Sequence, residues 1–495
     1  MVKRAGGALL LSVTIDRASA RPVSTQLYVI LRDLILSGGF AAGERLPASR
    51  TLARDLGVSR TTVIEAFDRL TAEGLIDSRV GAGTYVARAL DARRPRPVAD
   101  VARPEARPAR LSRAMARSVE RFGERARLPS VARAFTTALP AFDAFPMAQW
   151  ARLSAKHWRR NRGDVMGYGE PLGHAPLRQA IAAHLRANRG IGCDAEQIFI
   201  VAGEQHAFSL LGAVLLDPGD KVWFENPGAI GARNSLIAAG ADLVPLPVDE
   251  QGLRVDEGLG RAPRFRLAFV TPSHQQPLGV VMSLERRFAL LHAAERAGAW
   301  VIEDDYDGEF SFGGTPLPTL KSVDTTGLVI YVGTFSKSLF PSLRLGYLLA
   351  PPALVDTLRS IMSKLLHGVP SFAQSVVAEF IDEGHFASHL RRMRRIYAER
   401  HEALCVAARR ELGGLLDVVP SQSGLHTIGH LGAGLAEVAV ALRPRVALSC
   451  APARRARRAA RPRRSRSPAV GCRRSPAPGR APASSPVHNG RSAIP

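Results

Sequence analysis

The chain has 495 residues, too many for one ordinary hydrophobic core, and 46% of them are apolar, as in globular proteins. Its net charge of +23 is concentrated in two segments: residues 438–495 hold 14 arginines and no acid, and residues 88–133 have a net charge of +8. The rest is almost neutral, so charge alone does not identify a partner. No apolar run is long enough to span a bilayer, and the four cysteines lack metal-ligand spacing; we therefore expect a cytoplasmic protein without a metal site.

Residues 12–88 are predicted to form a winged helix. Apolar residues recur at helical spacing between Gln26 and Ser37, and two shorter helical patterns follow, separated by a turn at Gly57. Ser59 is expected to cap the second of these, because its hydroxyl can accept a hydrogen bond from the first turn. The stretch IDSRVGAGTYVA then predicts two strands around a tight glycine loop. Together these elements make a winged helix-turn-helix, a DNA-binding module.

A linker is expected at residues 89–130. This segment is rich in arginine, proline and alanine and lacks apolar periodicity, and repeated prolines favour an extended, semi-rigid spacer. A charged helix between Leu111 and Arg127 is compatible with this interpretation.

Residues 131–437 alternate short apolar strands with helices, in stretches such as QIFIVAG, LAFVTPSH and LVIYVGTFSKSL. Strands with little polar alternation are typical of parallel sheets buried on both faces, so the predicted class is α/β with a mostly parallel sheet. Ligands of such sheets bind at the carboxyl ends of the strands. Glu225, His274, Asp304 and Lys337 each follow a predicted strand, which indicates one shared pocket.

Lys337, in GTFSKSLFPSLRLGY, is the strongest candidate for chemistry. We expect it in a loop after a buried strand, flanked by serines that include Ser336, with Thr334 before it and Arg344 after it. Hydroxyl groups and a guanidinium suit a phosphate dianion. A lysine beside a bound phosphate points to a cofactor aldehyde held as a Schiff base.

The stretch VIEDDYDGEF supplies groups that such a cofactor needs. Asp304 is the candidate carboxylate that keeps a pyridine nitrogen protonated, so that the ring withdraws electrons. Tyr306 can donate a hydrogen bond to the 3-oxygen of the ring. In AGEQHAF, Gly203 opens a helix whose first backbone N–H groups can bind a phosphate.

The motifs GYGEPLGHAPLRQAIAAHL, AGEQ, ENPG, TPSHQQPLG, EDDYDGEF and SKSLFPSLRLGY follow one another in this order. They resemble a fold-type I aminotransferase domain dependent on pyridoxal 5′-phosphate (PLP), and together with a GntR-type winged helix the chain resembles the MocR-type transcription regulators. This resemblance covers residues 11–437 and implies PLP as cofactor, Lys337 as the Schiff-base lysine, and Asp304 and Tyr306 as its catalytic partners. The other cofactor-binding residues that it implies are Thr334, Ser336, Arg344, Gly203, Glu204, Gln205, Gln276 and Tyr168, the last of which reaches the phosphate of the partner subunit in a homodimer.

Three positions bear on ligand recognition. Arg233 matches the family and is the candidate for binding the carboxylate of an amino-compound effector. Ala229 stands where the family usually has an aromatic residue that stacks on the cofactor ring, which predicts weaker ring binding. Gln276 takes the place that simple aminotransferases give to an asparagine before proline.

The same resemblance predicts how the winged helix contacts double-stranded DNA. The second helix of the helix-turn-helix enters the major groove, where Arg60 is the expected base contact because a guanidinium fits a guanine edge bidentately. The other expected contacts lie at the start of that helix, near the preceding helix and on the wing: Arg45, Ser49, Arg50, Ser59, Thr61, Thr62, Arg79, Gly81 and Gly83.

Residues 438–495 form a basic, low-complexity tail that we expect to be disordered. The small C-terminal subdomain of the family should continue here, but no motif of it is found, so the subdomain is expected to be incomplete. Out-of-frame reading of GC-rich codons yields arginine, proline, alanine and serine, and we interpret the tail as a frameshifted product. The alternative is a genuine basic tail that adds salt-dependent affinity for DNA.

Two functions fit the sequence. The leading hypothesis is a DNA-binding transcription regulator whose aminotransferase-like domain binds PLP and senses PLP or an amino compound. The alternative is an active PLP-dependent aminotransferase with an accessory DNA-binding domain. Half-transamination uses the same lysine, so the sequence does not separate the two, and a chain that folds poorly without its full small subdomain remains a third hypothesis.

Overall fold

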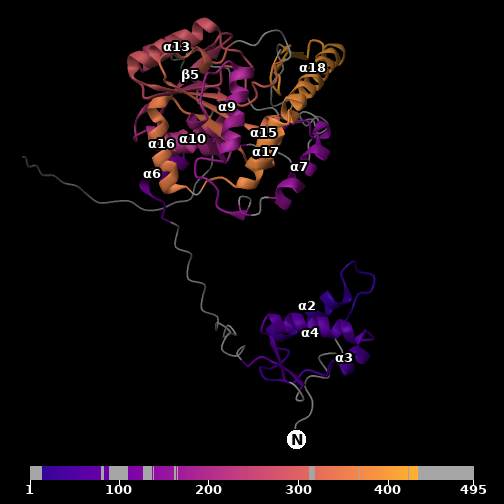
Figure 1. The fold of residues 1–495 in the computed structure, drawn as a ribbon. Helices are drawn as coiled ribbons and strands as arrows, with labels where there is room; N and C mark the ends of the chain where they lie inside the picture. The colour runs from indigo at the N-terminus through magenta and orange to yellow at the C-terminus, as the bar shows by residue number, and fades with distance from the viewer. Residues whose placement is uncertain are drawn as a thin grey trace, which may run out of the picture. The chain divides into compact units, whose positions relative to one another are not determined.

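The computed structural model describes residues 14–79, 83–88, 110–125, 136–137, 139–160, 163, 166–311, 318–366, 368–421 and 423–432. The chain divides into two compact units, Met1–Arg110 and Leu111–Pro495 (Figure 1). Each unit has its own buried apolar clusters.

The first unit is a winged helix. Helices α2 (Val23–Leu36), α3 (Ser49–Asp55) and α4 (Arg60–Ala72) bury their apolar faces in one cluster. Strands β1 (Ile76–Arg79) and β2 (Gly83–Val86) pair antiparallel and form the wing. The predicted order of helices and wing strands is confirmed, although α2 begins three residues before Gln26.

The second unit is built on an eight-stranded sheet in the order β3-β10-β9-β8-β7-β4-β5-β6. Neighbours from β9 to β5 run parallel, whereas β10 is antiparallel to both β9 and β3, and β6 is antiparallel to β5. The predicted α/β class with a mostly parallel sheet is therefore confirmed. The strands are β3 (Ile198–Val201), β4 (Lys221–Asn226), β5 (Asp242–Asp249), β6 (Gly252–Leu253), β7 (Leu267–Val270), β8 (Trp300–Asp305), β9 (Val329–Thr334) and β10 (Gly346–Leu349).

Helices cover both faces of this sheet. Side chains of β3 alternate between two apolar clusters: Ile200 packs with residues of α9 and α17, while Phe199 packs with residues of α10, α11 and α16. A third cluster joins β7 and β8 to α12 and α13. The longer helices are α7 (Met147–Arg160), α9 (Ala175–Arg189), α10 (Glu204–Leu215), α11 (Ile230–Ala238), α12 (Val255–Arg261), α13 (Leu284–Ala297), α16 (Pro352–Leu365), α17 (Ser371–Asp382) and α18 (His385–Leu412).

Part of the predicted linker belongs to the second unit. Helix α6 (Arg113–Val119) is capped by Ser112, whose hydroxyl accepts a hydrogen bond from the backbone of Met115 at 3.1 Å. The helix lies against α11 and is held there by Ser118, which is buried and donates to the carbonyl of Ile237 at 3.0 Å. Residues 89–109 and 126–130 of the predicted linker lie outside the described residues.

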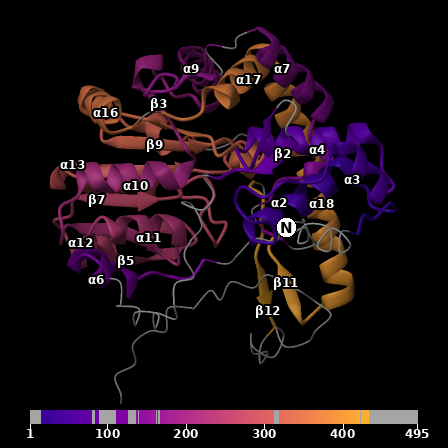
Figure 2. The ribbon, with the colours of Figure 1, turned by 90° about the horizontal axis from the view of Figure 1, so that it is seen from below.

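The described chain ends beside α18. Strand β11 (Leu416–Val418) packs against this helix and pairs with β12 (Gly429–Leu431) (Figure 2). The predicted tail at 438–495 lies outside the described residues. Among the described helices, none combines the length and apolar character needed to cross a bilayer.

Candidate functional site

The candidate site lies at the carboxyl ends of β8 and β9. Asp304 is the second-last residue of β8, and Lys337 follows β9. The expectation that Lys337 lies in a loop is wrong, because it belongs to the short helix α15 (Phe335–Ser338). Thr334 starts this helical turn, since its hydroxyl accepts a hydrogen bond from the backbone N–H of Ser336 at 3.2 Å.

The surroundings of Asp304 suit an acid that pairs with a cationic ligand. Its side chain is buried, and Oδ1 has no hydrogen-bond partner. Burial raises the pKa of Asp304 well above its usual value, and the nearby carboxylate of Glu204 raises it further. A protonated ring nitrogen placed against Oδ1 would supply the missing partner, so this residue fits its predicted role.

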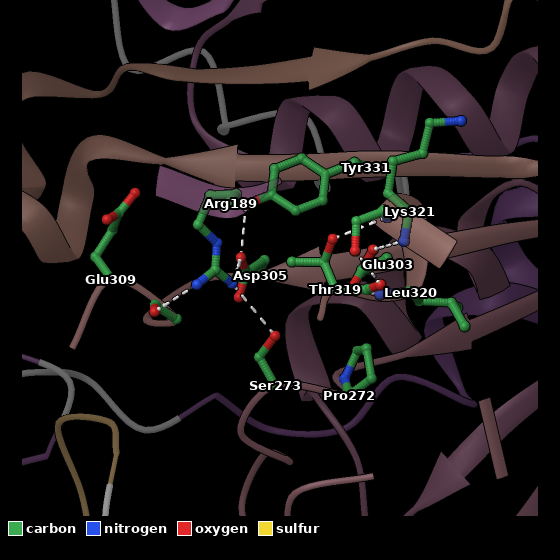
Figure 3. A network of polar contacts seen from close by, with 12 residues as sticks. Arg189, Pro272, Ser273, Glu303, Asp305, Glu309, Thr319, Leu320, Lys321 and Tyr331 are labelled. Atoms are coloured by element: carbon green, nitrogen blue, oxygen red, sulfur yellow. Dashed lines mark hydrogen bonds and ion pairs between the residues drawn. The ribbon is translucent and has the colours of Figure 1, made fainter. Parts of the chain in front are cut away.

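The strand that carries Asp304 is fixed from its opposite face. Successive strand residues point to opposite faces, so Asp305 faces away from the site. There it accepts hydrogen bonds from Arg189 and from the hydroxyl of Tyr331, the latter at 2.5 Å (Figure 3). Arg189 also donates to the carbonyl of Gly308 at 2.8 Å, so the turn after β8 is held as well.

The groups predicted to bind a phosphate are brought together. Gly203 caps the N-terminus of α10 with φ 83°, and the first N–H groups of a helix, which have no partner within it, can bind a phosphate. The guanidinium carbon of Arg344 would lie 3.7 Å from a Cβ added to Gly203, so the two residues are neighbours. Thr334 pairs with Gly346 on the adjacent strand, and both Thr334 and Ser336 are buried. We call Gly203, Thr334, Ser336 and Arg344 the phosphate corner.

The next two residues of α10 have different environments. Glu204 is the first helical residue, and its Oε2 is buried without a hydrogen-bond partner. Gln205 accepts a hydrogen bond from Arg125, a residue of the predicted linker, at 3.2 Å. Gln205 thus connects the start of α10 with the segment that follows α6 in the same unit.

Gln276 lies in a loop organised by a buried acid. Glu225 accepts hydrogen bonds from the backbone and hydroxyl of Thr271, at 3.2 and 2.6 Å, and from Gln275 at 3.0 Å. Burial raises the pKa of Glu225 to about 7. The backbone N–H of Gln276 donates to the Thr271 hydroxyl at 3.1 Å, so its position is fixed, and contact of its side chain with a cofactor remains a prediction.

Two further predicted residues lie apart from this corner. Arg233, on α11, donates a hydrogen bond to the carbonyl of Arg121 at 2.8 Å, so in the structure it binds the linker segment. Tyr168 is 84% exposed, as a residue that serves a partner subunit would be, and this role remains a prediction.

The sequence analysis placed His274 in the pocket without a role, and it did not assign Asp307 or the half-buried His426. His274 Nδ1 lies 2.9 Å from Asp307 Oδ2 and 3.2 Å from the hydroxyl of Tyr306. His426 lies against the ring of His274, with 4.4 Å between ring centroids, and its pKa is lowered first by burial and then by the charges of His274 and Lys337. The position of His274 after a strand was a usable signal, whereas a lone histidine in GLHTIG gave none.

In the DNA-binding unit, the structure describes most of the residues that were predicted to contact DNA. Ser59 caps α4, accepting from the backbone of Thr62 at 3.1 Å, which confirms the predicted cap. Arg60 and Thr61 follow it and are exposed. The remaining candidates are distributed as follows: Ser49 and Arg50 begin α3, Arg45 bridges to Tyr85 of the wing and packs on Gly83, and Gly81 and the side chain of Arg79 lie outside the described residues.

Fold and site together define a class of protein, in which a winged-helix DNA-binding unit is joined to an aminotransferase-like unit. Residues 23–86 match the family of bacterial regulatory proteins named gntR, and residues 139–457 match aminotransferase class I and II. The second match ends twenty residues beyond the predicted boundary at 437.

Similar proteins specify the family. The chain is 44% identical over 420 residues to a probable rhizopine catabolism regulatory protein, MocR, of Rhizobium meliloti, covering 84% of this chain and 83% of that protein. It is 30% identical to the pyridoxine biosynthesis transcriptional regulator PdxR of Corynebacterium glutamicum, covering 84% and 85%. The chain belongs to the MocR-type transcription regulators of the GntR family.

A solved structure supports the fold of the second unit. An α-aminoadipate aminotransferase from Thermus thermophilus, determined with N-(5′-phosphopyridoxyl)-L-leucine, is 32% identical with a TM-score of 0.56, covering 61% of this chain and 78% of that one. The chain is thus similar to a PLP-dependent enzyme over most of the second unit.

Proposed function

We propose that this regulator binds PLP through Lys337 and senses PLP or an amino compound, which then changes its binding to DNA. PLP, when bound, supplies an aldehyde that condenses with amines and a ring that withdraws electrons. The residues that would hold it are those grouped at the site: Asp304 for the ring nitrogen, Tyr306 for the 3-oxygen, and Gly203, Thr334, Ser336 and Arg344 for the phosphate. The unpartnered, buried Oδ1 of Asp304 supports this assignment.

The observation that carries the sensing role is the contact between the site and the linker segment. Arg233, the candidate effector arginine, binds the carbonyl of Arg121, and Gln205, beside the phosphate corner, binds Arg125. Between them, the backbone of Gly123 forms two hydrogen bonds with the side chain of Asn234, at 2.9 and 2.8 Å. We call this set of contacts around residues 121–125 the linker clasp.

A ligand at the site would compete with the linker clasp. A carboxylate binds a guanidinium more strongly than a neutral carbonyl does, so an effector carboxylate at Arg233 would displace Arg121. A ligand shifts a conformational equilibrium only by its difference in affinity for the two states, and here the difference lies in this exchange of partners. We propose that release of the linker clasp is the first step by which such a ligand alters DNA binding.

A homodimer is part of the same proposal. Large apolar side chains on and near α7 are exposed, which is costly in water and is typical of an interface. They include Met147 at 64%, Trp158 at 51% and Met166 at 74% exposure, close in sequence to Tyr168. A second copy of the chain would cover this region, and sedimentation of the purified protein tests it.

The alternative function is an active aminotransferase. The presence of Lys337, Asp304 and Tyr306 is compatible with it. Both functions need the same chemistry at Lys337, so the deciding measurement is turnover. Sustained conversion of an amino donor and a 2-oxo acid would support the enzyme, whereas operator binding that responds to ligand without turnover would support the sensor.

Absorbance spectroscopy tests the proposal directly. Purified protein mixed with PLP should acquire visible absorbance that borohydride removes, and mass spectrometry should locate the reduced adduct on Lys337. The same sample should then be titrated with operator DNA, with and without amino compounds. A colourless protein with no adduct on Lys337 would refute the proposed cofactor.

A further inference from the structure

A pair of buried residues beside Tyr306 is not used by the function proposed above. His274 and Asp307 are each 1% exposed at their side chains, and they lie 2.9 Å apart between Nδ1 and Oδ2. The same Nδ1 is 3.2 Å from the hydroxyl oxygen of Tyr306. One ring nitrogen thus faces both a carboxylate and the phenol that is expected to meet the cofactor.

The direction of these hydrogen bonds follows from the chemistry of the partners. Burial tends to raise the pKa of Asp307, but the charge and hydrogen bond of His274 outweigh it and hold the pKa below its usual value. An ionised carboxylate only accepts hydrogen bonds, so the proton between the two residues belongs to Nδ1 of His274. A protonated Nδ1 cannot accept from Tyr306, and the phenol therefore keeps its own proton available for another acceptor.

The surroundings hold this arrangement in place. The backbone N–H of Leu425 donates to the same oxygen of Asp307 at 3.1 Å. Two glycines lie close against the ring of His274. A Cβ added to Gly424 would be 2.1 Å from Cε1 of the ring, and a Cβ added to Gly279 would be 3.2 Å from Nε2. The ring therefore lies in a slot that admits no larger side chain at Gly424 without moving it.

We propose that Asp307 and His274 are positioning residues for Tyr306: Asp307 fixes the proton on Nδ1 of His274, this N–H group faces the phenol oxygen, and the hydroxyl proton of Tyr306 is thereby directed into the site. This inference rests on the proposed function, because the 3-oxygen of PLP is the acceptor that the phenol would meet. A hydrogen bond donated to the 3-oxygen makes that oxygen a weaker acceptor for a proton nearby on the cofactor. Asp307 and His274 would therefore lower the pKa of the bound cofactor without contacting it.

Other charged and titratable groups face this pair and enter any pH dependence. His426 stays neutral at pH 7, because burial and the charge of His274 lower its pKa to about 4. It donates from Nε2 to the carbonyl of Pro277 at 3.2 Å. The remaining groups that act on Tyr306 or on these histidines are Asp304, Glu204, Glu225 and Lys337.

The same residues also offer metal ligands, and the geometry favours the proton instead. His274, Asp307 and His426 can each place one ligand atom within 4.8 Å of the others. Asp307 already shares the Nδ1 proton of His274, and a metal bound there would have to displace it. Zinc titration is therefore included below as an outcome that would overturn the proposal.

The first test needs no cofactor. In the full-length protein labelled with ¹⁵N-histidine, the signals of His274, assigned by comparison with the His274→Asn variant, should show a proton on Nδ1 at pH 7. An Nδ1 without a proton, or loss of that proton on adding one equivalent of Zn²⁺, would overturn the proposal. Because the protein is cofactor-free, failure of the proposed PLP site does not affect this result.

The second test asks whether His274 acts through Tyr306. With PLP bound, His274→Asn should raise the pH midpoint of the visible absorbance change by about one unit, because the phenol would no longer be held as a hydrogen-bond donor to the 3-oxygen. In a Tyr306→Phe background the same substitution should give a much smaller shift, because its target is gone. Equal shifts in both backgrounds would show that His274 does not act through the phenol.

Control variants separate positioning from simple support of the fold. His157→Asn removes a half-buried histidine, which pairs with Glu379 at 2.8 Å outside the site, and should leave the midpoint unchanged. Asp307→Asn should shift it in the same direction as His274→Asn. If His274→Asn lowers thermal stability but leaves the midpoint of a coloured protein unmoved, the pair is only structural and the proposal is wrong.

Discussion

Arg233 donates a hydrogen bond to the carbonyl oxygen of Arg121, with 2.8 Å between Nη1 and O. The two residues are 112 positions apart: Arg121 follows α6, and Arg233 lies on α11, which packs against α10. A single side chain thus connects α11 with the segment that follows α6.

The linker clasp should loosen when its central amide is removed. Asn234→Ala deletes both hydrogen bonds to the backbone of Gly123. One hydrogen bond contributes about 1 kcal/mol, so amide exchange at residues 121–125 should accelerate about tenfold or more. Hydrogen–deuterium exchange followed by mass spectrometry measures this in the full-length protein.

Asn188→Ala is the matched control for the linker clasp, because this amide bonds only locally to His184 on α9. It should leave exchange at residues 121–125 unchanged. Unaltered exchange in Asn234→Ala as well would mean that other contacts hold the segment, and the proposed competition at Arg233 would lose its basis.

The main elements and the central residues were predictable from the sequence because their signals are local. Ser59 before an apolar-periodic helix predicted its cap, and the confirmed hydrogen bond to Thr62 is three residues away. Strand periodicity placed Asp304 and Lys337 at strand ends, which meet at one edge in a mostly parallel sheet. The four residues of α15 are too few to show helical periodicity, so Lys337 was assigned to a loop.

The contacts that surround these residues were beyond sequence reasoning, because they join distant segments. Asp307 binds the backbone of Leu425, 118 residues away, and His426 reaches the site from the same turn between β11 and β12. The docking of α6 on α11 likewise depends on tertiary contacts that no local pattern records.

Loss of the reactive amine should separate the two units functionally. Lys337→Ala removes the only atom expected to bond covalently to PLP, so the visible absorbance and the borohydride adduct should disappear. Operator binding in the absence of ligand should stay within about twofold, because the winged helix has its own core. Absorbance spectra and fluorescence anisotropy with labelled DNA measure the two effects.

Lys364→Ala, an exposed lysine in the last turn of α16, is the control and should change neither property. Equal loss of colour and of DNA binding in Lys337→Ala would contradict the independence of the two units.

Burial of Glu225 should make the second unit less stable as the pH rises. Its pKa is raised by burial from 4.5 to about 7, so the folded state holds a proton that the unfolded state releases. Stability is therefore greatest below pH 4.5 as far as this group is concerned, and it falls between about pH 4.5 and 7 by roughly 3 kcal/mol at most. Above pH 7 the contribution is constant.

Glu225→Gln, which cannot ionise, should flatten this part of the pH profile. Urea denaturation followed by tryptophan fluorescence reports on the second unit alone, because all four tryptophans lie in it. Glu303, whose pKa burial also raises to about 7, leaves a similar slope in both proteins, so the difference between them is the informative quantity. Identical profiles for the variant and the parent would show that Glu225 is not protonated in the folded state.

Arg60 should carry base specificity in the first unit. It is exposed at the N-terminus of α4, the helix expected in the major groove, where a guanidinium can bind a guanine edge through two hydrogen bonds. Arg60→Ala should weaken operator binding by about 1 to 3 kcal/mol and relax the preference at one base position.

Arg60→Lys keeps the charge but loses the bidentate geometry, so it should relax specificity while largely retaining affinity for nonspecific DNA. Binding to a set of operators substituted one base pair at a time distinguishes these effects; a uniform loss across all operators in Arg60→Ala would instead make Arg60 a phosphate contact.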